Sequence, residues 1–124
     1  MTKPSDELLK RAYAQDASIY QETPQDVAFP AFEEEVVALV RSGKPLIPRA
    51  AGTSLAGQVV GDGTVLDTGR HMNAILQINV EEQWAEVQPG VVRDELNYHL
   101  KEYGLFFGPN TSTSNRCMMG GMVG

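Results

Sequence analysis

The chain has a single cysteine and no long apolar run. One cysteine, Cys117, in 124 residues excludes an internal disulfide framework and is typical of a reducing compartment. The first residues lack the apolar stretch of a secretory signal, and no apolar run approaches the length that spans a bilayer. These absences predict a cytoplasmic protein without a membrane-spanning segment.

Positive charge is also scarce. Ten lysines and arginines stand against 16 aspartates and glutamates, which gives a formal net charge of −6. The basic residues are scattered, so the chain lacks a cluster that would displace counterions from phosphates, and no nucleic-acid partner is expected. His71, His99 and Cys117 do not have the spacing of zinc ligands, so no metal site is expected. Surface or structural roles are favoured for these three residues.

Apolar residues make up 42% of the chain, which is enough for it to fold as one modest domain. Hydrophobic periodicity and capping residues predict short alternating elements. Helices are expected over residues 5–13, 32–41 and 92–103. Strands are expected over residues 27–30, 46–50, 64–69, 74–80 and 84–90. The fold class is therefore α+β, a β-α-β unit followed by further strands and a helix.

Two details of this pattern concern packing. Leu76, Ile78 and Val80 are expected to share one face of the strand 74–80, which pairs with the strand 84–90 in a hairpin. The last residues, 118–124, are glycine-rich and are expected to form a loop that no closing strand or helix follows. This ending suggests that the chain is the N-terminal piece of a longer protein.

The stretch "PRAAGTSLAG", residues 48–57, is almost bare of side chains and follows a predicted strand. It is not a P-loop, because Gln58 and Val59 stand where lysine and a hydroxyl residue are required. The dinucleotide fingerprint also fails, because Leu66 occupies the third glycine position. A tight turn built on two glycines and a backbone surface pressed against a ligand both remain open. For Arg49, a phosphate and a nearby acid are equally open as partners.

Two later segments favour a ligand. Residues 108–115 are rich in hydroxyl and amide groups that can donate to phosphate or ribose oxygens, and residues 120–124 expose bare backbone. Three such loops in one small domain indicate a large ligand with a pyrophosphate at its centre. Ordinary surface turns are the alternative.

Several segments together resemble a known family. They are "PRAAGTSLAGQ" (48–58), "QPGVV" (88–92), "GLFFGPNTST" (104–113) and "GGMVG" (120–124), with "YAQDASIY" (13–20) and "DTGRHMNAIL" (67–76) in support. In this order they resemble FAD-linked oxidases of the p-cresol methylhydroxylase and vanillyl-alcohol oxidase type. The D-lactate dehydrogenase and glycolate oxidase branch is the most similar. The resemblance implies the first part of a two-subdomain FAD-binding fold, with an N-terminal helical extension over 1–24 and an incomplete FAD-binding domain over 25–124.

The resemblance also implies which residues meet the cofactor. The pyrophosphate would lie against Ala50, Ala51, Gly52, Thr53 and Ser54, although relatives usually have glycine where Ala50 and Ala51 stand. The flavin would be lined by Pro89, Gly90 and Val91. The remaining diphosphate, ribitol and ring edge would be held by Pro109, Ser112, Thr113, Gly120, Gly121 and Val123. A valine at Gly52 is expected to remove FAD while most of the fold survives.

The implied reaction moves hydride from the α-carbon of a small D-2-hydroxy acid, such as lactate or glycolate, to flavin N5. FAD is expected to be non-covalent in this part, because Thr53 stands where some relatives carry the linking histidine. The electron acceptor is not identified, and catalytic residues are expected beyond Gly124, so none is named and the chain alone is expected to be inactive. A non-catalytic module that binds a nucleotide or partner, and a truncated product that folds only in part, are the rival interpretations.

Overall fold

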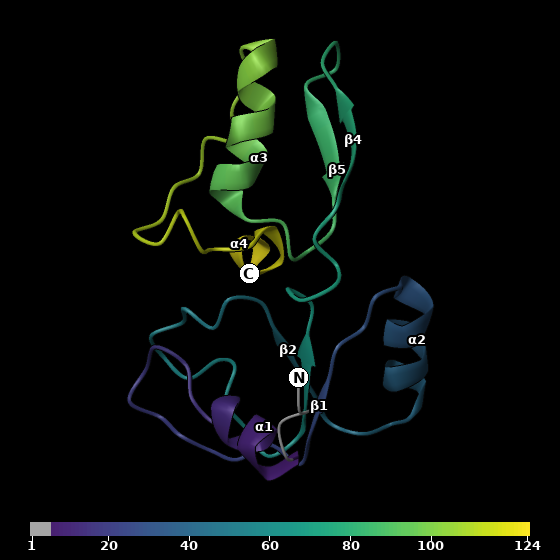
Figure 1. Ribbon diagram of the computed structural model, residues 1–124, viewed down its shortest axis with the longest axis vertical. Coiled ribbons are helices and arrows are strands. Elements are labelled where there is room, and N and C mark those ends of the chain that lie inside the picture. Colours follow the sequence, from purple (N-terminus) through teal and green to yellow (C-terminus); the bar gives the residue numbers. More distant parts are fainter. Residues whose placement is uncertain (1–5) are drawn as a thin grey trace.

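Two small sheets divide residues 6–124, which the computed structural model describes, into two halves (Figure 1). The lower half contains the strands β1 to β3 with the helices α1 and α2. The upper half contains the hairpin of β4 and β5 with the helix α3. The short helix α4 lies where the two halves meet. Mixed helices and strands in this order confirm the predicted α+β class.

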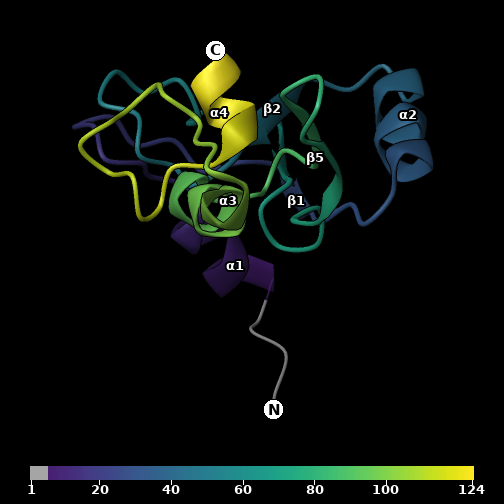
Figure 2. The same cartoon turned by 90° about the horizontal axis from the view of Figure 1, so that it is seen from above.

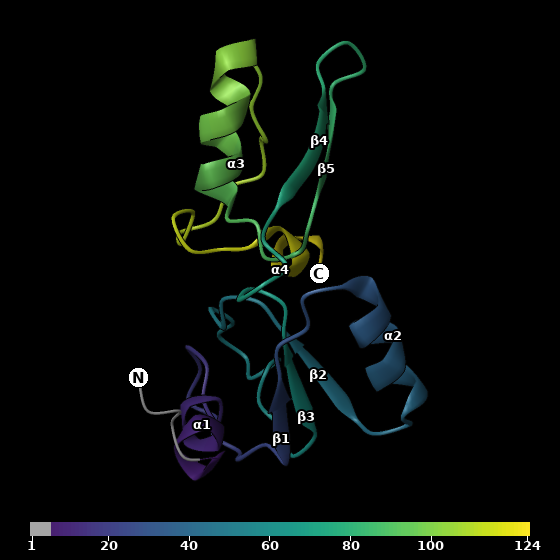
Figure 3. The same ribbon diagram turned by 45° about the vertical axis from the view of Figure 1, so that its right-hand side comes forward.

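The lower sheet has three parallel strands in the order β1-β3-β2 (Figure 3). β1 spans Asp26–Ala28, β2 spans Leu46–Arg49 and β3 spans Thr64–Asp67. The central strand β3 is buried, as expected for a parallel strand with neighbours on both sides. α1 (Asp6–Ala12) precedes the sheet, and α2 (Glu33–Arg41) connects β1 to β2. The predicted β-α-β unit is therefore present.

α2 shows why the sequence forms these elements. Its first turn carries three glutamates at the positive end of the helix dipole. Its end is followed by Gly43, whose φ of +69° is the left-handed conformation that terminates helices. In the upper half, Gly104 has a φ of +68° and ends the helical run in the same way.

The upper half packs the hairpin against one helix. β4 (Ile75–Asn79) and β5 (Trp84–Val87) are antiparallel, which confirms the predicted hairpin. α3 (Arg93–Leu100) continues as the short 3-10 helix η1 (Lys101–Tyr103). The buried core of this half consists of Val91, Leu96 and Leu100, so the predicted inner face of the helix is confirmed.

The predicted inner face of β4 is wrong in part. The pairing of β4 with β5 is irregular between Ile75 and Gln77, and such a bulge resets the alternation of faces. Ile75 and Ile78 therefore pack against the core. Leu76 is 55% exposed and Val80 is 42% exposed.

The predicted C-terminal loop is also wrong, because Met119–Val123 forms the helix α4. Two contacts with the upper half hold it: the amide of Met119 donates to the carbonyl of Val91 at 2.8 Å, and the amide of Gly120 donates to that of Pro89 at 2.9 Å. A Cβ at Gly120 would lie 2.6 Å from the Pro89 Cβ, so close packing requires this glycine. Tertiary contacts therefore override the low helix propensity of the segment.

The N-terminal segment lies against the lower sheet. Ala14 is fully buried, and the amide of Ala17 donates to the carbonyl of Gly52 at 3.1 Å. The predicted helix 5–13 is confirmed over Asp6–Ala12, whereas its proposed cap, Ser5, lies outside the described residues. The division of the chain at residue 24 stays a prediction. Within residues 6–124, every helix is too short to cross a bilayer.

Candidate functional site

The glycine-rich loop leaves the carboxyl end of β2, where ligands bind in open parallel sheets. Gly52 and Gly57 have φ values of +67° and +75°, so both adopt the left-handed conformation that glycine tolerates best. The tight turn considered from the sequence is therefore present. Because its glycines carry no side chains, the turn also allows a ligand to approach the backbone, so both sequence alternatives remain compatible with it.

Arg49 fixes the start of this loop through contacts with the N-terminal segment. Its Nη1 donates to the carbonyl of Gln15 at 2.8 Å, and its guanidinium lies 5.1 Å from the ring centroid of Tyr13. The guanidinium also packs on Gly52, where a Cβ would lie 2.6 Å from Nη2. Arg49 therefore connects the N-terminal segment to the loop.

This placement adds a structural consequence to the expectation for Gly52. The sequence-based interpretation had a valine side chain there enter the space of a pyrophosphate. In the structure the side chain would point at Arg49, and a β-branched residue would be strained at a positive φ. A substitution at Gly52 is therefore expected to damage the fold.

Tyr13 makes a second connection between the N-terminal segment and the sheet. Its hydroxyl donates to Asp67 Oδ2 at 2.5 Å, and its ring packs edge-on against Phe29 with the centroids 5.8 Å apart. Asp67 Oδ1 also accepts from the amide of Gly69 at 2.8 Å. Burial, followed by the hydrogen bond to Asp67, raises the pKa of Tyr13 to about 12.

The raised pKa of Tyr13 predicts how stability depends on pH. Because the folded-state pKa of about 12 exceeds the ordinary value of 10.0, the folded state holds this proton more tightly. The contribution is fully present below pH 10 and is lost as the pH rises toward 12. We expect Tyr13→Phe to flatten the alkaline decrease in the free energy of unfolding, measured by urea denaturation at several pH values. Tyr98→Phe, at an exposed tyrosine, should leave it unchanged; an equal effect of both variants would contradict the prediction.

The segment Pro89–Val91 passes through the junction of the two halves. The amide of Gly90 donates to the carbonyl of Met72 at 2.7 Å. Val91 is 1% exposed and packs with Leu96 and Leu100. Of the three residues predicted to line the flavin, Gly90 and Val91 are buried and Pro89 is half-buried. The side chain of Val91 is therefore committed to the core, and contact of Gly90 or Val91 with the flavin stays a prediction.

α4 brings predicted residues from both halves together. Gly120 packs on Pro89, and a Cβ at Gly121 would meet only the Ala50 Cβ, at 3.6 Å. Val123, at the end of the helix, is 88% exposed. Three of the predicted segments, around Ala50, Pro89 and Gly120, thus meet at one place in the fold.

The fourth predicted segment, residues 109–113, lies beside this junction. It follows α3 and runs on the same side of α4 as the loop 50–57, as two views show (Figures 1 and 3). The view from above also places it beside α4 (Figure 2). The following hydroxyls hydrogen-bond to no other residue of 6–124: Thr53, Ser54, Ser112 and Thr113. These groups are free to donate to a ligand.

The remaining candidates lie elsewhere. His71 and His99 are exposed, and Cys117 is buried with its Sγ 3.1 Å from Thr111 Oγ1. Across residues 6–124 no three His, Cys, Asp or Glu side chains gather as a metal site would require. A groove of about 760 Å³ lies between β4 and α3, with Ile75, Ile78 and Tyr98 in its lining. Of the predicted site residues, Val91 alone lines it, and the loop 50–57, the segment 109–113 and α4 lie outside it.

Sequence reasoning missed the residues that hold these segments in place: Tyr13, Asp67, Arg93 and Asn97. One signal was available for Arg93. It opens α3, where the helix dipole disfavours a cation, so the residue needs a partner outside the helix. The partner of Tyr13 lies 54 residues along the chain, which no local pattern indicates.

The structure is that of an α+β domain whose bare and hydroxyl-rich segments meet between two halves. A family model described as "FAD binding domain" matches residues 24–124, and the chain belongs to this family. The family resemblance, the fold class and FAD as the cofactor are therefore confirmed. The individual contact residues stay a prediction.

Curated relatives carry related names. The chain is 47% identical to a D-2-hydroxyglutarate dehydrogenase of Pseudomonas putida, over 96% of the chain and 12% of the relative. It is 38% identical to a mitochondrial D-lactate dehydrogenase [cytochrome] of Kluyveromyces lactis, over 68% of the chain and 16% of the relative. It is 32% identical to the glycolate oxidase subunit GlcD of Bacillus subtilis, over 90% of the chain and 25% of the relative.

A solved structure agrees on the fold. Alkyldihydroxyacetonephosphate synthase matches with a TM-score of 0.66 and 27% identity, over 77% of this chain and 21% of that one. The chain spans only a small share of the length of the relatives it matches. The activity of a whole protein is therefore a matter for proposal.

Proposed function

We propose that the chain is the FAD-binding part of a flavin-dependent dehydrogenase or oxidase that acts on a D-2-hydroxy acid. The observation that carries the proposal is the meeting of Ala50, Pro89 and Gly121 beside loops with free hydroxyls. Bare backbone at such a place allows close approach of a pyrophosphate, and the hydroxyls supply donors. The junction therefore fits the cofactor that the family binds.

In this proposal the residues of this chain bind and position the cofactor. The backbone of residues 50–54 faces the pyrophosphate, the hydroxyls of Ser112 and Thr113 donate to the remaining diphosphate or ribitol, and Pro89 borders the flavin. Bound FAD would accept hydride from the substrate, while the protein supplies position and electrostatics. FAD is held without a covalent bond from this part, since Thr53 is a poor nucleophile toward the ring.

The names of the relatives support the substrate class. They include D-2-hydroxyglutarate, D-lactate and glycolate enzymes, and all three substrates are 2-hydroxy acids. The substrate-binding and proton-accepting residues are proposed to lie outside this chain, so the chain alone shows no turnover. Cytoplasmic location and an electron acceptor of open identity remain part of the same proposal.

Gly121→Leu tests the proposed cofactor position. The new side chain would extend from α4 beside Ala50, into space that the described residues leave open. Leucine exceeds glycine in helix propensity by about 0.8 kcal/mol, so the thermal midpoint should stay the same or rise. FAD affinity, measured by flavin fluorescence titration of the purified chain, should fall at least about tenfold, which is about 1.4 kcal/mol.

Ala38→Leu is the matched control, since it adds a similar side chain to an exposed position of α2. It should leave FAD affinity unchanged. Unaltered FAD affinity in folded Gly121→Leu would contradict the proposed position. Absence of FAD binding by the wild-type chain would contradict the proposal for this chain as a whole.

A further inference from the structure

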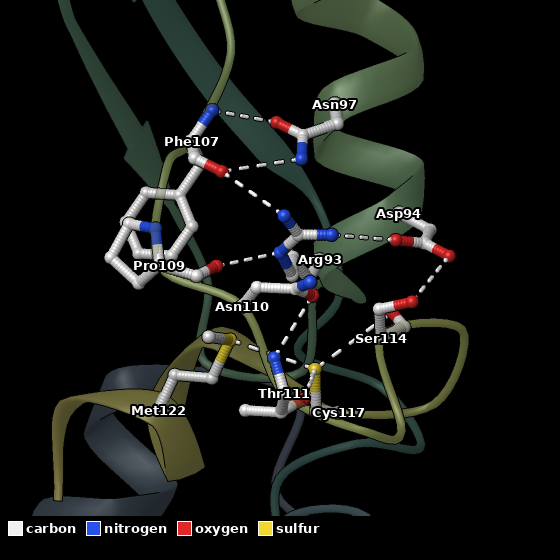
Figure 4. A network of polar contacts seen from close by, with 10 residues as sticks. All are labelled: Arg93, Asp94, Asn97, Phe107, Pro109, Asn110, Thr111, Ser114, Cys117 and Met122. Carbon is white, nitrogen blue, oxygen red and sulfur yellow. Dashed lines mark hydrogen bonds and ion pairs between the residues drawn. The ribbon is translucent and has the colours of Figure 1, made fainter.

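The first turns of α3 contact both ends of the loop 107–117 (Figure 4). Three side chains make these contacts, Arg93, Asp94 and Asn97, and we call them the α3 clamp. The loop contains the hydroxyl segment 109–113, which the proposed function places against FAD. The clamp itself has no predicted contact with the cofactor.

The upstream end of the loop is held by four hydrogen bonds to backbone. Arg93 Nε donates to the carbonyl of Pro109 at 2.7 Å, and Nη2 donates to that of Phe107 at 3.5 Å. Asn97 forms a two-way pair with Phe107: its Oδ1 accepts from the amide at 2.6 Å, and its Nδ2 donates to the carbonyl at 3.3 Å. Two side chains on α3 thus fix the backbone of Phe107 and Pro109, which leads into the segment 109–113.

The downstream end is held by the same turn of the helix. Asp94 Oδ2 accepts from Ser114 Oγ at 3.1 Å, and the amide of Asp94 donates to the carbonyl of Ser114 at 3.3 Å. The amide of Arg93 donates to the carbonyl of Cys117 at 3.0 Å. The ends of the loop are therefore set by one rigid element.

Within its own helix, the side chain of Arg93 has one partner, Asp94. Its side chain is only 13% exposed, and a buried guanidinium is costly unless its donors are paired. Asp94 Oδ1 lies 3.0 Å from Nη1, and the two loop carbonyls accept hydrogen bonds from Nε and Nη2. Since the dipole disfavours a cation at the start of a helix, the loop contacts account for the residue.

Between its fixed ends the loop leaves donors free. Ser112 and Thr113 have unpartnered hydroxyls within residues 6–124, whereas Thr111 Oγ1 donates to the buried Cys117 Sγ at 3.1 Å. A loop already ordered before binding avoids the entropic cost of ordering its side chains on the ligand. This division into fixed backbone and free hydroxyls is what a preorganised binding loop requires.

We propose that Arg93 and Asn97 are positioning residues that hold the segment 109–113 in its FAD-binding conformation. The inference rests on the proposed function. It predicts that loss of the clamp weakens FAD binding without loss of the fold. The fewer hydrogen bonds to loop carbonyls a variant retains, the weaker its FAD binding should be.

The experiment compares four forms of the 124-residue chain: wild type, Arg93→Met, Arg93→Lys and Arg41→Met. Methionine removes every donor of Arg93, whereas lysine retains a charge that can reach one carbonyl but not both. Arg41→Met is the matched control, because Arg41 is exposed at the end of α2. Flavin fluorescence titration measures the FAD dissociation constant. Amide hydrogen exchange at Phe107, Arg116 and Cys117, whose amides are hydrogen-bonded, is measured without FAD and reports loop order.

We expect Arg93→Met to weaken FAD binding about tenfold and to speed exchange at Phe107, Arg116 and Cys117, consistent with loss of charge-assisted hydrogen bonds. Arg93→Lys should restore about half of that loss on a logarithmic scale, and Arg41→Met should match wild type. If Arg93→Met fails to fold, Asn97→Ser replaces it and should weaken binding with faster exchange at Phe107.

Two results would overturn the inference, and they differ. If wild type binds FAD and folded clamp variants bind it equally well, the proposed function stands and the clamp has only a structural role. If wild type binds no FAD, the proposed function fails for this chain and the inference fails with it.

Discussion

Gly90→Ala is expected to lower the free energy of unfolding by about 3 kcal/mol, the upper end of the usual cost of overpacking. A Cβ at this position would lie 2.6 Å from the carbonyl oxygens of Met72 and Thr68, and 2.8 Å from the Gly69 Cα. All three are backbone atoms, so no side chain can rotate away. The hydrogen bond from the Gly90 amide to the Met72 carbonyl would be strained as well. The measurement is urea denaturation followed by circular dichroism.

Gly108→Ala is the control for this prediction. The nearest atom to a Cβ at Gly108 is 3.7 Å away, on the ring of Phe106, so the methyl group fits without rearrangement. This variant should unfold within about 0.5 kcal/mol of wild type. A similar small effect for Gly90→Ala would show that the junction of the two halves is looser than the packing around Gly90 indicates.

Gly52→Val is expected to cost about 3 kcal/mol for two separate reasons. A β-branched residue at a φ of +67° is strained by roughly 1–2 kcal/mol, and the new side chain displaces the Arg49 guanidinium. Displacement breaks the hydrogen bond from Arg49 to the carbonyl of Gln15 and frees the N-terminal segment. Thermal unfolding and limited proteolysis near residues 13–22 measure the two consequences.

Gly104→Val separates the two reasons. Gly104 has nearly the same φ, +68°, but nothing lies within 4 Å of a Cβ there. Its variant should show the backbone strain alone, about 1–2 kcal/mol, with the N-terminal segment still protected from proteolysis. Equal costs at Gly52 and Gly104 would contradict a structural role for the contact between Arg49 and Gly52.

The sequence was sufficient for the order and type of most elements, because local signals specify them. The acidic first turn and Gly43 define α2, and alternating side chains define the hairpin. The resemblance to FAD-linked oxidases, carried by four segments, then supplied the family and the cofactor. These results depend on residues that are close together in the sequence.

The errors occurred where distant contacts decide the structure. α4 forms because the carbonyls of Pro89 and Val91 accept hydrogen bonds from its first amides. The glycine content of the segment gave no sign of a helix. The face of β4 depends on a bulge in its pairing with β5. Arg49 donates to a backbone carbonyl in the N-terminal segment, which no pattern indicated because carbonyls have no sequence signature, and its contact with a phosphate stays a prediction. Whether the predicted residues contact FAD stays a prediction.

The contacts between the N-terminal segment and β3 imply an order of folding. Tyr13 meets Asp67 across 54 residues, and the parallel strands of the lower sheet likewise pair across long stretches of chain. β4, β5 and α3 follow one another directly and close through short loops. Because closing long loops slows folding, the upper half should acquire protection from hydrogen exchange first during refolding. During synthesis, the hydroxyl of Tyr13 would remain without its partner Asp67 until β3 has left the ribosome.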